Sequence, residues 1–163
     1  MISISKSAQV SRLADIEDSK FGTSILIEDR VYIDSFVRIR PVGGRGDVRI
    51  GKDSFINAGT VIFSGNGVDI GQWVLIAPNC TLAPTNHAYA SRERTIRHQG
   101  FLPSKGGIVI EDDCWIGANC TVLDGSLLRK GCVIGAGSLV RGEVEAYSVN
   151  SGNPLRKTGM RGD

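Results

Sequence analysis

Aliphatic residues return every six positions through most of this chain. A period of six fits neither the 3.6-residue repeat of a helix nor one long alternating strand. It is typical of a β-helix, in which short strands are separated by turns. The pattern therefore predicts an all-β chain with a single core. The aliphatic positions are Ile27, Ile33, Ile39, Ile50, Ile56, Ile62, Ile70, Ile76, Leu82, Ile110, Ile116, Val122, Leu128, Ile134 and Val140.

A second column of small or β-branched residues lies four positions after the aliphatic ones. Both columns should point inward and stack on their equivalents one coil away, about 4.8 Å along the axis. Three six-residue repeats (hexads) make one triangular coil, so Cys114 should stack on Cys132. We expect about five to six coils. The second column comprises Val31, Val37, Ser54, Thr60, Val74, Cys80, Cys114, Cys120, Ser126, Cys132, Ser138 and Val144.

The six-residue register breaks at three places. Two short breaks cross Pro41–Gly44 and Ser64–Gly67, and a long one runs from Pro84 to Gly107. Insertions in repeat proteins are extruded as loops, which often carry function. We therefore predict one domain over 1–163. It has an irregular first coil at 1–26, coils at 27–83 and 108–153, a long loop at 84–107 and a C-terminal tail at 154–163.

Composition and charge change this picture little. The 21 glycines suit tight turns, and the net charge of +2 indicates no nucleic-acid partner. The sequence has neither a signal peptide nor an apolar run of membrane-spanning length, so a cytoplasmic protein is the default expectation. All four cysteines lie in the small column, which predicts buried, reduced thiols. A disulfide between Cys114 and Cys132 is conceivable but unexpected in a cytoplasmic chain.

The candidate chemistry lies in the long loop. Both histidines of the chain, His87 and His98, fall within it and outside the packed columns. Imidazole groups titrate close to neutral pH and serve as general bases, although a solvated loop position is the alternative interpretation. A separate set of outward-facing apolar residues recurs on stacked coils and predicts a subunit interface. These residues are Phe55, Val61, Leu75, Val133 and Leu139.

Several motifs resemble the hexapeptide-repeat acyltransferases, in particular the sugar and lipopolysaccharide O-acetyltransferases related to maltose and galactoside acetyltransferases. The similarity covers roughly Ile50 to Arg156. It implies a left-handed parallel β-helix, a homotrimer and transfer of an acetyl group from acetyl-coenzyme A (acetyl-CoA). The motifs are the hexads Ile116–Thr121 and Ile134–Ser138, together with Thr85–His87, Ile96–Gly100, Asp113–Gly117 and Ser151–Pro154.

The resemblance also implies roles for individual residues. His87 matches the catalytic base, which takes a proton from the acceptor hydroxyl or amine. Asn57, Asn86 and Trp115 match positions that hold the acceptor, and Trp115 also lines the pantetheine channel. Asn57 could equally be a turn residue and Trp115 a packing residue. The implied coenzyme-binding positions are Trp115, the backbone of Gly117, Ala118, Gly135 and Ala136, and the cations Arg141, Arg156 and Lys157.

Two features depart from that family. The maltose and galactoside members have a longer helical front end, which supplies an acidic acceptor ligand, and we assign no counterpart here. The loop is also basic, which suits an acidic or phosphorylated acceptor such as a nucleotide sugar, or else docking onto a neighbouring subunit. Its cations are Arg92, Arg94, Arg97 and Lys105, against Glu93.

The leading hypothesis is an acetyl-CoA-dependent O-acetyltransferase that acts on a sugar or sugar-containing acceptor. N-acetylation of an amino sugar, free or nucleotide-linked, is the alternative, because the same base would serve an amine. A non-catalytic scaffold or binding module would leave the histidine-bearing loop before Trp115 without a purpose. A γ-type carbonic anhydrase needs three His ligands around zinc, and this chain has two histidines. No metal is therefore expected.

Overall fold

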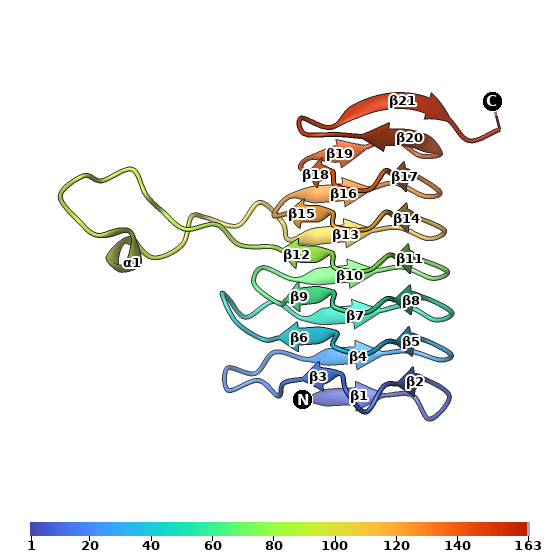
Figure 1. Ribbon diagram of the computed structural model, residues 1–163. Helices are drawn as coiled ribbons and strands as arrows, with labels where there is room; N and C mark the ends of the chain where they lie inside the picture. Colours follow the sequence, from blue (N-terminus) through green and yellow to red (C-terminus); the bar gives the residue numbers. More distant parts are fainter. Residues whose placement is uncertain (163) are drawn as a thin grey trace.

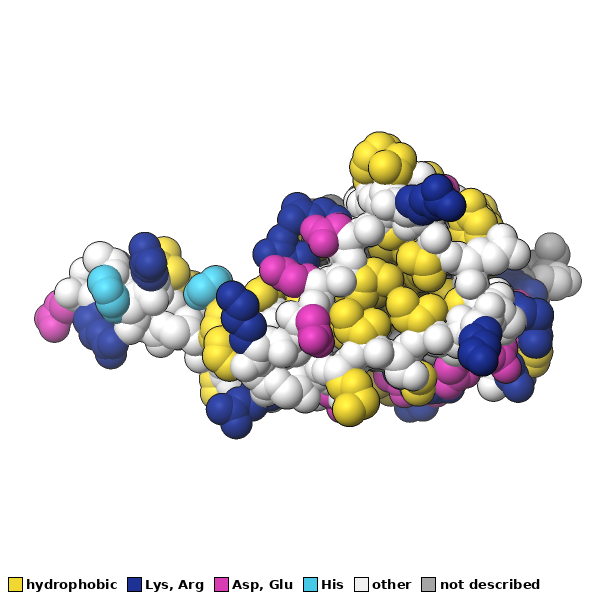
Figure 2. All heavy atoms as spheres, turned by 90° about the horizontal axis from the view of Figure 1, so that it is seen from below, with side chains coloured by type: hydrophobic (Ala, Val, Ile, Leu, Met, Phe, Trp, Pro, Cys, Tyr) yellow, Lys and Arg dark blue, Asp and Glu magenta, His cyan; other side chains and the backbone are white. Residues whose placement is uncertain are grey.

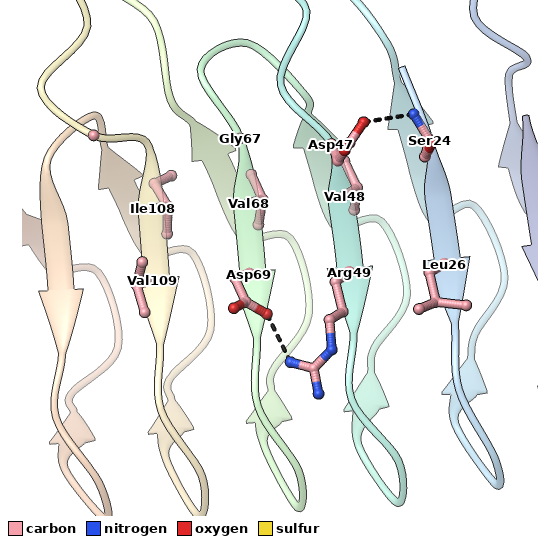
Figure 3. Close-up of a pocket in the computed structure, with 11 residues that line it drawn as sticks. Ser24, Leu26, Asp47, Val48, Arg49, Gly67, Val68, Asp69, Ile108 and Val109 are labelled. Carbon is pink, nitrogen blue, oxygen red and sulfur yellow. Dashed lines mark hydrogen bonds and ion pairs between the residues drawn. The ribbon is translucent and has the colours of Figure 1, made fainter. Parts of the chain in front are cut away.

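The computed structural model describes residues 1–162 and forms a left-handed parallel β-helix, which confirms the predicted fold (Figure 1). Three parallel sheets form its sides. In Figure 3 the strands of the front sheet run downwards, the chain then turns behind them, and successive coils advance to the left. The sheets have seven, eight and six strands, and we call them A, B and C. Sheet C contributes one strand to each of six complete coils, and β19 (Glu143–Val144) and β20 (Ser148–Ser151) begin a seventh.

The strands are short, and each sheet takes every third one up to β20, after which β21 joins sheet B. Sheet A contains β1 (Ile2–Ile4), β4 (Ile25–Ile27), β7 (Val48–Ile50), β10 (Val68–Ile70), β13 (Ile108–Ile110), β16 (Ser126–Leu128) and β19 (Glu143–Val144). Sheet B contains β2 (Gln9–Val10), β5 (Tyr32–Ile33), β8 (Phe55–Ile56), β11 (Leu75–Ile76), β14 (Trp115–Ile116), β17 (Val133–Ile134), β20 (Ser148–Ser151) and β21 (Arg156–Met160). Sheet C contains β3 (Asp15–Ile16), β6 (Arg38–Arg40), β9 (Val61–Phe63), β12 (Thr81–Ala83), β15 (Thr121–Leu123) and β18 (Leu139–Val140).

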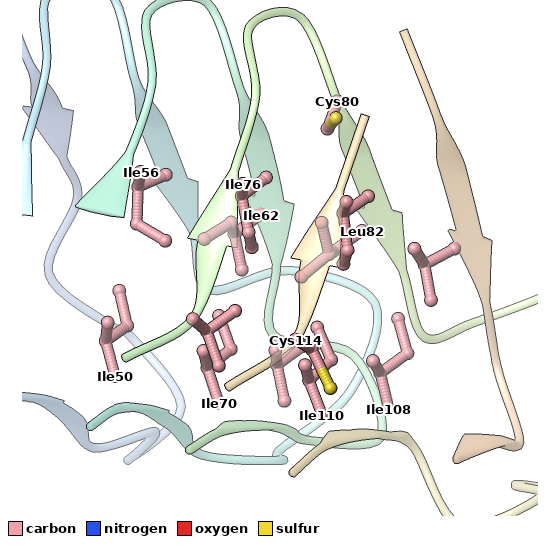
Figure 4. Close-up of a cluster of buried hydrophobic side chains, with 14 of the residues drawn as sticks. Ile50, Ile56, Ile62, Ile70, Ile76, Cys80, Leu82, Ile108, Ile110 and Cys114 are labelled. Atoms are coloured by element: carbon pink, nitrogen blue, oxygen red, sulfur yellow. The ribbon is translucent and has the colours of Figure 1, made fainter. Parts of the chain in front are cut away.

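The two predicted columns fill the interior. Every residue of both columns is buried, and the hexad isoleucines stack sheet by sheet, as Ile50, Ile70 and Ile110 do in Figure 4. Burying one such side chain contributes about 1.5–3 kcal/mol. Cys114 and Cys132 face each other with their sulfurs 3.6 Å apart, which confirms the predicted stacking, and all four cysteines are free thiols. Hydrogen bonds between facing thiols, and then burial, raise the pKa of Cys80 and of Cys132.

The three corners of the coil differ in regularity. From β4 to β18, every connection from sheet A to sheet B is four residues long, as at 51–54. Every connection from sheet B to sheet C is also four residues long, as at 57–60. The third residue of these turns takes a left-handed backbone, for example Asp53 at φ 60° and Asn79 at φ 60°. Connections from sheet C to sheet A instead range from 124–125 to the long loop at 84–107. This C–A corner therefore carries all the irregularity of the helix.

The N- and C-terminal segments extend the β-helix at its two ends. Residues 1–26 form the expected first coil, and its strands β1, β2 and β3 pair in parallel with the next one. Its aliphatic residues Ile4, Val10 and Ile16 keep the six-residue spacing and pair with Ile27, Ile33 and Ile39 of the next coil. Only the connection at 17–24 is long. The expected C-terminal tail instead contains β21, which pairs antiparallel with β20. Figure 2 shows apolar side chains at the centre of the N-terminal end, where Ile2, Val10 and Ile16 are half-buried.

Candidate functional site

The three register breaks meet at the C–A corner. The backbone N–H of Gly65 donates to the Val42 carbonyl at 3.0 Å, and that of Asn66 donates to the Pro84 carbonyl at 3.2 Å. These approaches require glycine. A Cβ on Gly65 would lie 2.1 Å from the Thr85 hydroxyl, and one on Gly44 would lie 2.1 Å from the Gly65 carbonyl oxygen. The breaks at 41–44, 64–67 and 84–107 are thus one packed layer that supports the base of the long loop.

His87 stands where the two stems of the long loop pair. The Ala88 N–H donates to the Gly100 carbonyl at 3.0 Å, and the Leu102 N–H donates to the Asn86 carbonyl at 2.8 Å. His87 and Phe101 form the bridge between these bonds, and their ring centroids are 4.7 Å apart. The His87 side chain is exposed, and no side chain of residues 1–162 hydrogen-bonds its ring. Its ring nitrogens are therefore free to bind a substrate hydroxyl or amine.

A pocket of about 290 Å³ opens beside the His87 ring. The Phe63 and Phe101 rings and the Val42 and Ala83 side chains give it apolar walls. Thr85 also lines it, but its hydroxyl donates to the Gly43 carbonyl at 3.3 Å. The pocket thus places a basic nitrogen at the rim of an apolar cavity.

A larger hollow of about 460 Å³ lies on the outer face of sheet A (Figure 3). The cation in it, Arg49, is held by Asp69 at 2.8 Å and by Glu28 at 2.9 Å. The lining residues of this hollow include the Ser24 hydroxyl and the Asp47 carboxylate but no histidine. The smaller pocket is the one that contains an imidazole, that of His87.

A buried carboxylate fixes the returning stem of the loop. Asp124 is 6% exposed and accepts the backbone N–H groups of Lys105 and Gly107, each at 2.9 Å. It also accepts the side-chain amide of Asn66 at 3.2 Å. Because Asn66 binds the Pro84 carbonyl through its own N–H, it connects both stems. Sequence reasoning missed Asp124, although an acidic residue between two hexads, followed by Gly125, was a usable signal.

A second group of implied site residues lies at the opposite edge of sheet C. Gly117 and Ala118 follow β14, and Gly135 and Ala136 follow β17, so the two pairs stack at the B–C corner. Packing alone explains the glycine at 117, because a Cβ there would lie 2.5 Å from the Ala136 nitrogen. Arg156 pairs with Ser151 at the same end of sheet B. Trp115 lies on the same sheet between Leu75 and Val133, and its side chain is 51% exposed.

Comparison with known proteins agrees with this architecture. A family model described as bacterial transferase hexapeptide (six repeats) matches residues 107–142. The chain belongs to the hexapeptide-repeat family. The galactoside O-acetyltransferase of Escherichia coli is 34% identical over 110 residues, which are 68% of this chain and 52% of that protein. This chain spans about half the length of the curated relatives that head the comparison.

Two solved structures superpose on most of the chain. The hexapeptide-repeat acetyltransferase VCA0836 of Vibrio cholerae, complexed with acetyl-CoA, has a TM-score of 0.72 at 27% identity and covers 88% of this chain and 73% of that one. The N-acyltransferase AntD of Bacillus cereus, as a point mutant in complex with dTDP and coenzyme A, has a TM-score of 0.80 at 21% identity. That alignment covers 96% of this chain and 82% of AntD, and it supports the fold.

The remaining implied residues of this hexapeptide-repeat protein are dispersed. The Asn57 side chain donates to the Ile76 carbonyl at 2.9 Å, which ties it to the next coil. Arg141 lies between β18 and β19 at the C–A corner, away from Arg156. Lys157 forms an ion pair with Glu145 at 2.8 Å. Asn86 lies beside His87. His98, in α1 (Ile96–Gln99) at the loop tip, contacts the Thr95 hydroxyl at 2.6 Å through Nδ1.

The described residues, 1–162, show neither a membrane-spanning helix nor a metal-binding cluster. None of their helices has the length and apolar character needed to cross a membrane. Nor do residues 1–162 contain a group of three or more His, Cys, Asp or Glu side chains arranged to hold a metal ion.

Proposed function

We propose that this chain is an acyltransferase that moves an acetyl group from acetyl-CoA to a hydroxyl of a sugar-containing acceptor, with His87 as general base. The observation that carries the proposal is the exposed His87 ring at the rim of a pocket, on the loop that interrupts the repeats. The relationship to a galactoside O-acetyltransferase and to VCA0836, which is complexed with acetyl-CoA, supports the reaction class.

The reaction follows from the position of the imidazole. The acceptor hydroxyl would donate its hydrogen bond to an unprotonated ring nitrogen of His87, which takes the proton as the oxygen attacks the thioester carbonyl. The carbon–sulfur bond then breaks, and the coenzyme thiolate leaves and receives a proton. Phe101, packed on the ring, and the paired loop stems hold the imidazole in place for this transfer.

The site is proposed to form between subunits of a homotrimer. Within one chain, His87 lies at the C–A corner, and the stacked small residues after β14 and β17 lie at the B–C corner. Sheet C separates the two groups. A threefold axis parallel to the helix would bring one corner of each subunit against the other corner of its neighbour. The outward apolar residues Phe55, Leu75 and Val133 on sheet B, with Val61 and Leu139 on sheet C, would then be covered.

The coenzyme is proposed to lie along the B–C corner. Its pantetheine would run over the backbone of Gly117, Ala118, Gly135 and Ala136, beside Trp115. Arg156 lies at the same end and would meet the phosphates. Arg141 lies on a different corner of its own chain, so it could reach this coenzyme only across the subunit boundary, and the pairing of Lys157 with Glu145 weakens its candidacy.

Thermal unfolding with acetyl-CoA and with free coenzyme A tests the donor. A ligand that binds only the folded state at a hundred times its dissociation constant stabilises it by about 2.7 kcal/mol. We expect a clear rise in melting temperature with either ligand. No shift at millimolar ligand would contradict the proposal. An acceptor panel of matched hydroxyl and amino sugars then distinguishes O-acetylation from the N-acetylation alternative.

A further inference from the structure

The pocket beside His87 also indicates what kind of acceptor the site takes. The atom that attacks the thioester must lie at the His87 ring, so the group next to that atom in the acceptor faces the pocket. Its walls are formed by Val42, Phe63, Ala83 and Phe101. The chemistry of these walls therefore selects among acceptors.

Polar partners are scarce inside this pocket. None of its lining residues is Asp, Glu, Asn, Gln, Lys or Arg. The Thr85 hydroxyl already donates to the Gly43 carbonyl at 3.3 Å, and His87 is needed at the rim. A hydroxyl placed in the pocket would lose its water without gaining a full set of hydrogen bonds, which is unfavourable. A methyl, deoxy or aryl group would lose nothing there.

We propose that the pocket binds an apolar group of the acceptor, adjacent to the acetylated atom, so that the preferred acceptors are deoxygenated or aryl-bearing rather than fully hydroxylated sugars. The inference rests on the proposed acyl transfer. Phe63 and Phe101 are its specificity-determining residues. They come from two different parts of the chain, since Phe63 ends β9, directly before the break at 64–67, and Phe101 lies on the returning stem of the long loop.

The occupant is the acceptor rather than a long acyl chain of the donor. The pocket lies at the C–A corner of the chain that carries His87, whereas the small-residue column proposed for the pantetheine lies at the B–C corner. In the proposed assembly the thioester arrives from the neighbouring subunit, whereas the pocket is formed by the chain that carries His87.

Matched sugar pairs test the proposal. Acetyl transfer would be measured as release of the coenzyme thiol with methyl α-D-fucopyranoside against methyl α-D-galactopyranoside, and methyl α-L-rhamnopyranoside against methyl α-L-mannopyranoside. Each pair differs by one hydroxyl at C6. We expect kcat/KM to favour the deoxy member of at least one pair by about ten- to hundredfold, the range a hydrophobic pocket achieves against an added hydroxyl.

Two variants locate the preference. Phe63→Asn should reduce it to about threefold or less by giving the hydroxyl a partner. Leu127→Asn, on the outer face of sheet A and away from the pocket, should leave it unchanged. A melting-temperature shift with acetyl-CoA in both variants shows that each is folded and binds the donor.

The outcomes separate the inference from the proposed function. Equal use of both members of each pair, or preference for the hydroxylated ones, overturns the inference and leaves acyl transfer intact. Failure of all four sugars, although acetyl-CoA raises the melting temperature, overturns it as well. If Phe63→Asn alters the preference between acetyl-CoA and butyryl-CoA but not between sugars, the pocket serves the donor. If acetyl-CoA produces no shift, the proposed function itself fails.

Discussion

Each coil of this protein has two regular corners, A–B and B–C, and one irregular corner, C–A. The B–C corner repeats one four-residue turn from coil to coil, as at 57–60, 77–80 and 117–120. The C–A corner varies: its connections at 41–47, 64–67 and 84–107 differ in length and sequence, although those at 124–125 and 141–142 are both two residues long. The regular corner keeps the inward columns in register, so its residues are constrained by packing between coils. The irregular corner is released from that requirement, and it holds both the pocket and His87.

The difference between the corners teaches where variation is tolerated. At the B–C corner an added Cβ on Gly117 meets the backbone of the next coil. At the C–A corner an entire loop leaves the body, as Figure 1 shows, and the strands on either side still pair as if it were absent. Stability and chemistry are therefore expected to respond to substitutions at different corners.

The largest effect on stability is expected from the regular part of the coil. Ile76→Ala removes a fully buried side chain that stacks between Ile56 and Ile116. The cavity should cost about 2–5 kcal/mol of unfolding free energy, measured by denaturant titration. A loss below about 1 kcal/mol would mean that the coils do not pack as tightly as the columns indicate.

Gly117→Ala should have the next largest effect. The new Cβ would lie 2.5 Å from the Ala136 nitrogen, so a coil must shift, at a cost of about 1–3 kcal/mol. Gly159→Ala is the matched control, because no atom lies within 4 Å of the Cβ position there. Equal melting temperatures for the two variants would contradict the packing explanation for glycine at the B–C corner.

Asp124→Ala tests the irregular corner. It leaves the N–H groups of Lys105 and Gly107 without their acceptor, at a cost of about 1–2 kcal/mol that should fall mainly on the loop stems. Hydrogen exchange should accelerate at these two amides while the β15 amides stay protected. Asp112→Ala, which removes the acceptor of the Gln72 N–H at the A–B corner, is the control and should leave the loop amides unchanged.

The smallest expected effect is a gain. Phe36, at the B–C corner, is 63% exposed and takes a left-handed backbone at φ 62°, which bulky side chains rarely adopt. Asn tolerates that conformation, so Phe36→Asn should raise the unfolding free energy by up to about 1 kcal/mol. A destabilised variant would instead show that the Phe36 ring is held by packing, as at a subunit contact.

The fold could be predicted from the sequence because the pattern of inward residues that produces it recurs every six positions. Each hexad contributes one inward aliphatic residue and one small residue, and the same pattern recurs in the next coil. A first coil was expected at 1–26, and its strands pair with the next coil, while its irregularity lies in the long connection at 17–24. The strand β21 was not expected, because it pairs antiparallel and carries no hexad.

The site was only partly predictable, because nothing along it repeats. His87 could be selected since it lies in the long register break. The breaks at 41–44 and 64–67 stack on the base of the long loop at one corner. This stacking brings Val42 and Phe63 close to the His87 ring, and it can be seen only in three dimensions. The same holds for Asp124, which reaches residues of two earlier connections.

The most direct test of the central claim compares His87→Ala with His98→Ala in an acetyl-transfer assay. If His87 is the base, its loss should lower kcat by about 10²–10⁴ while the melting temperature and its rise with acetyl-CoA stay as in the unmodified protein. His98→Ala, at the loop tip, should keep its rate. A His87→Ala protein that turns over at close to the original rate would contradict the account.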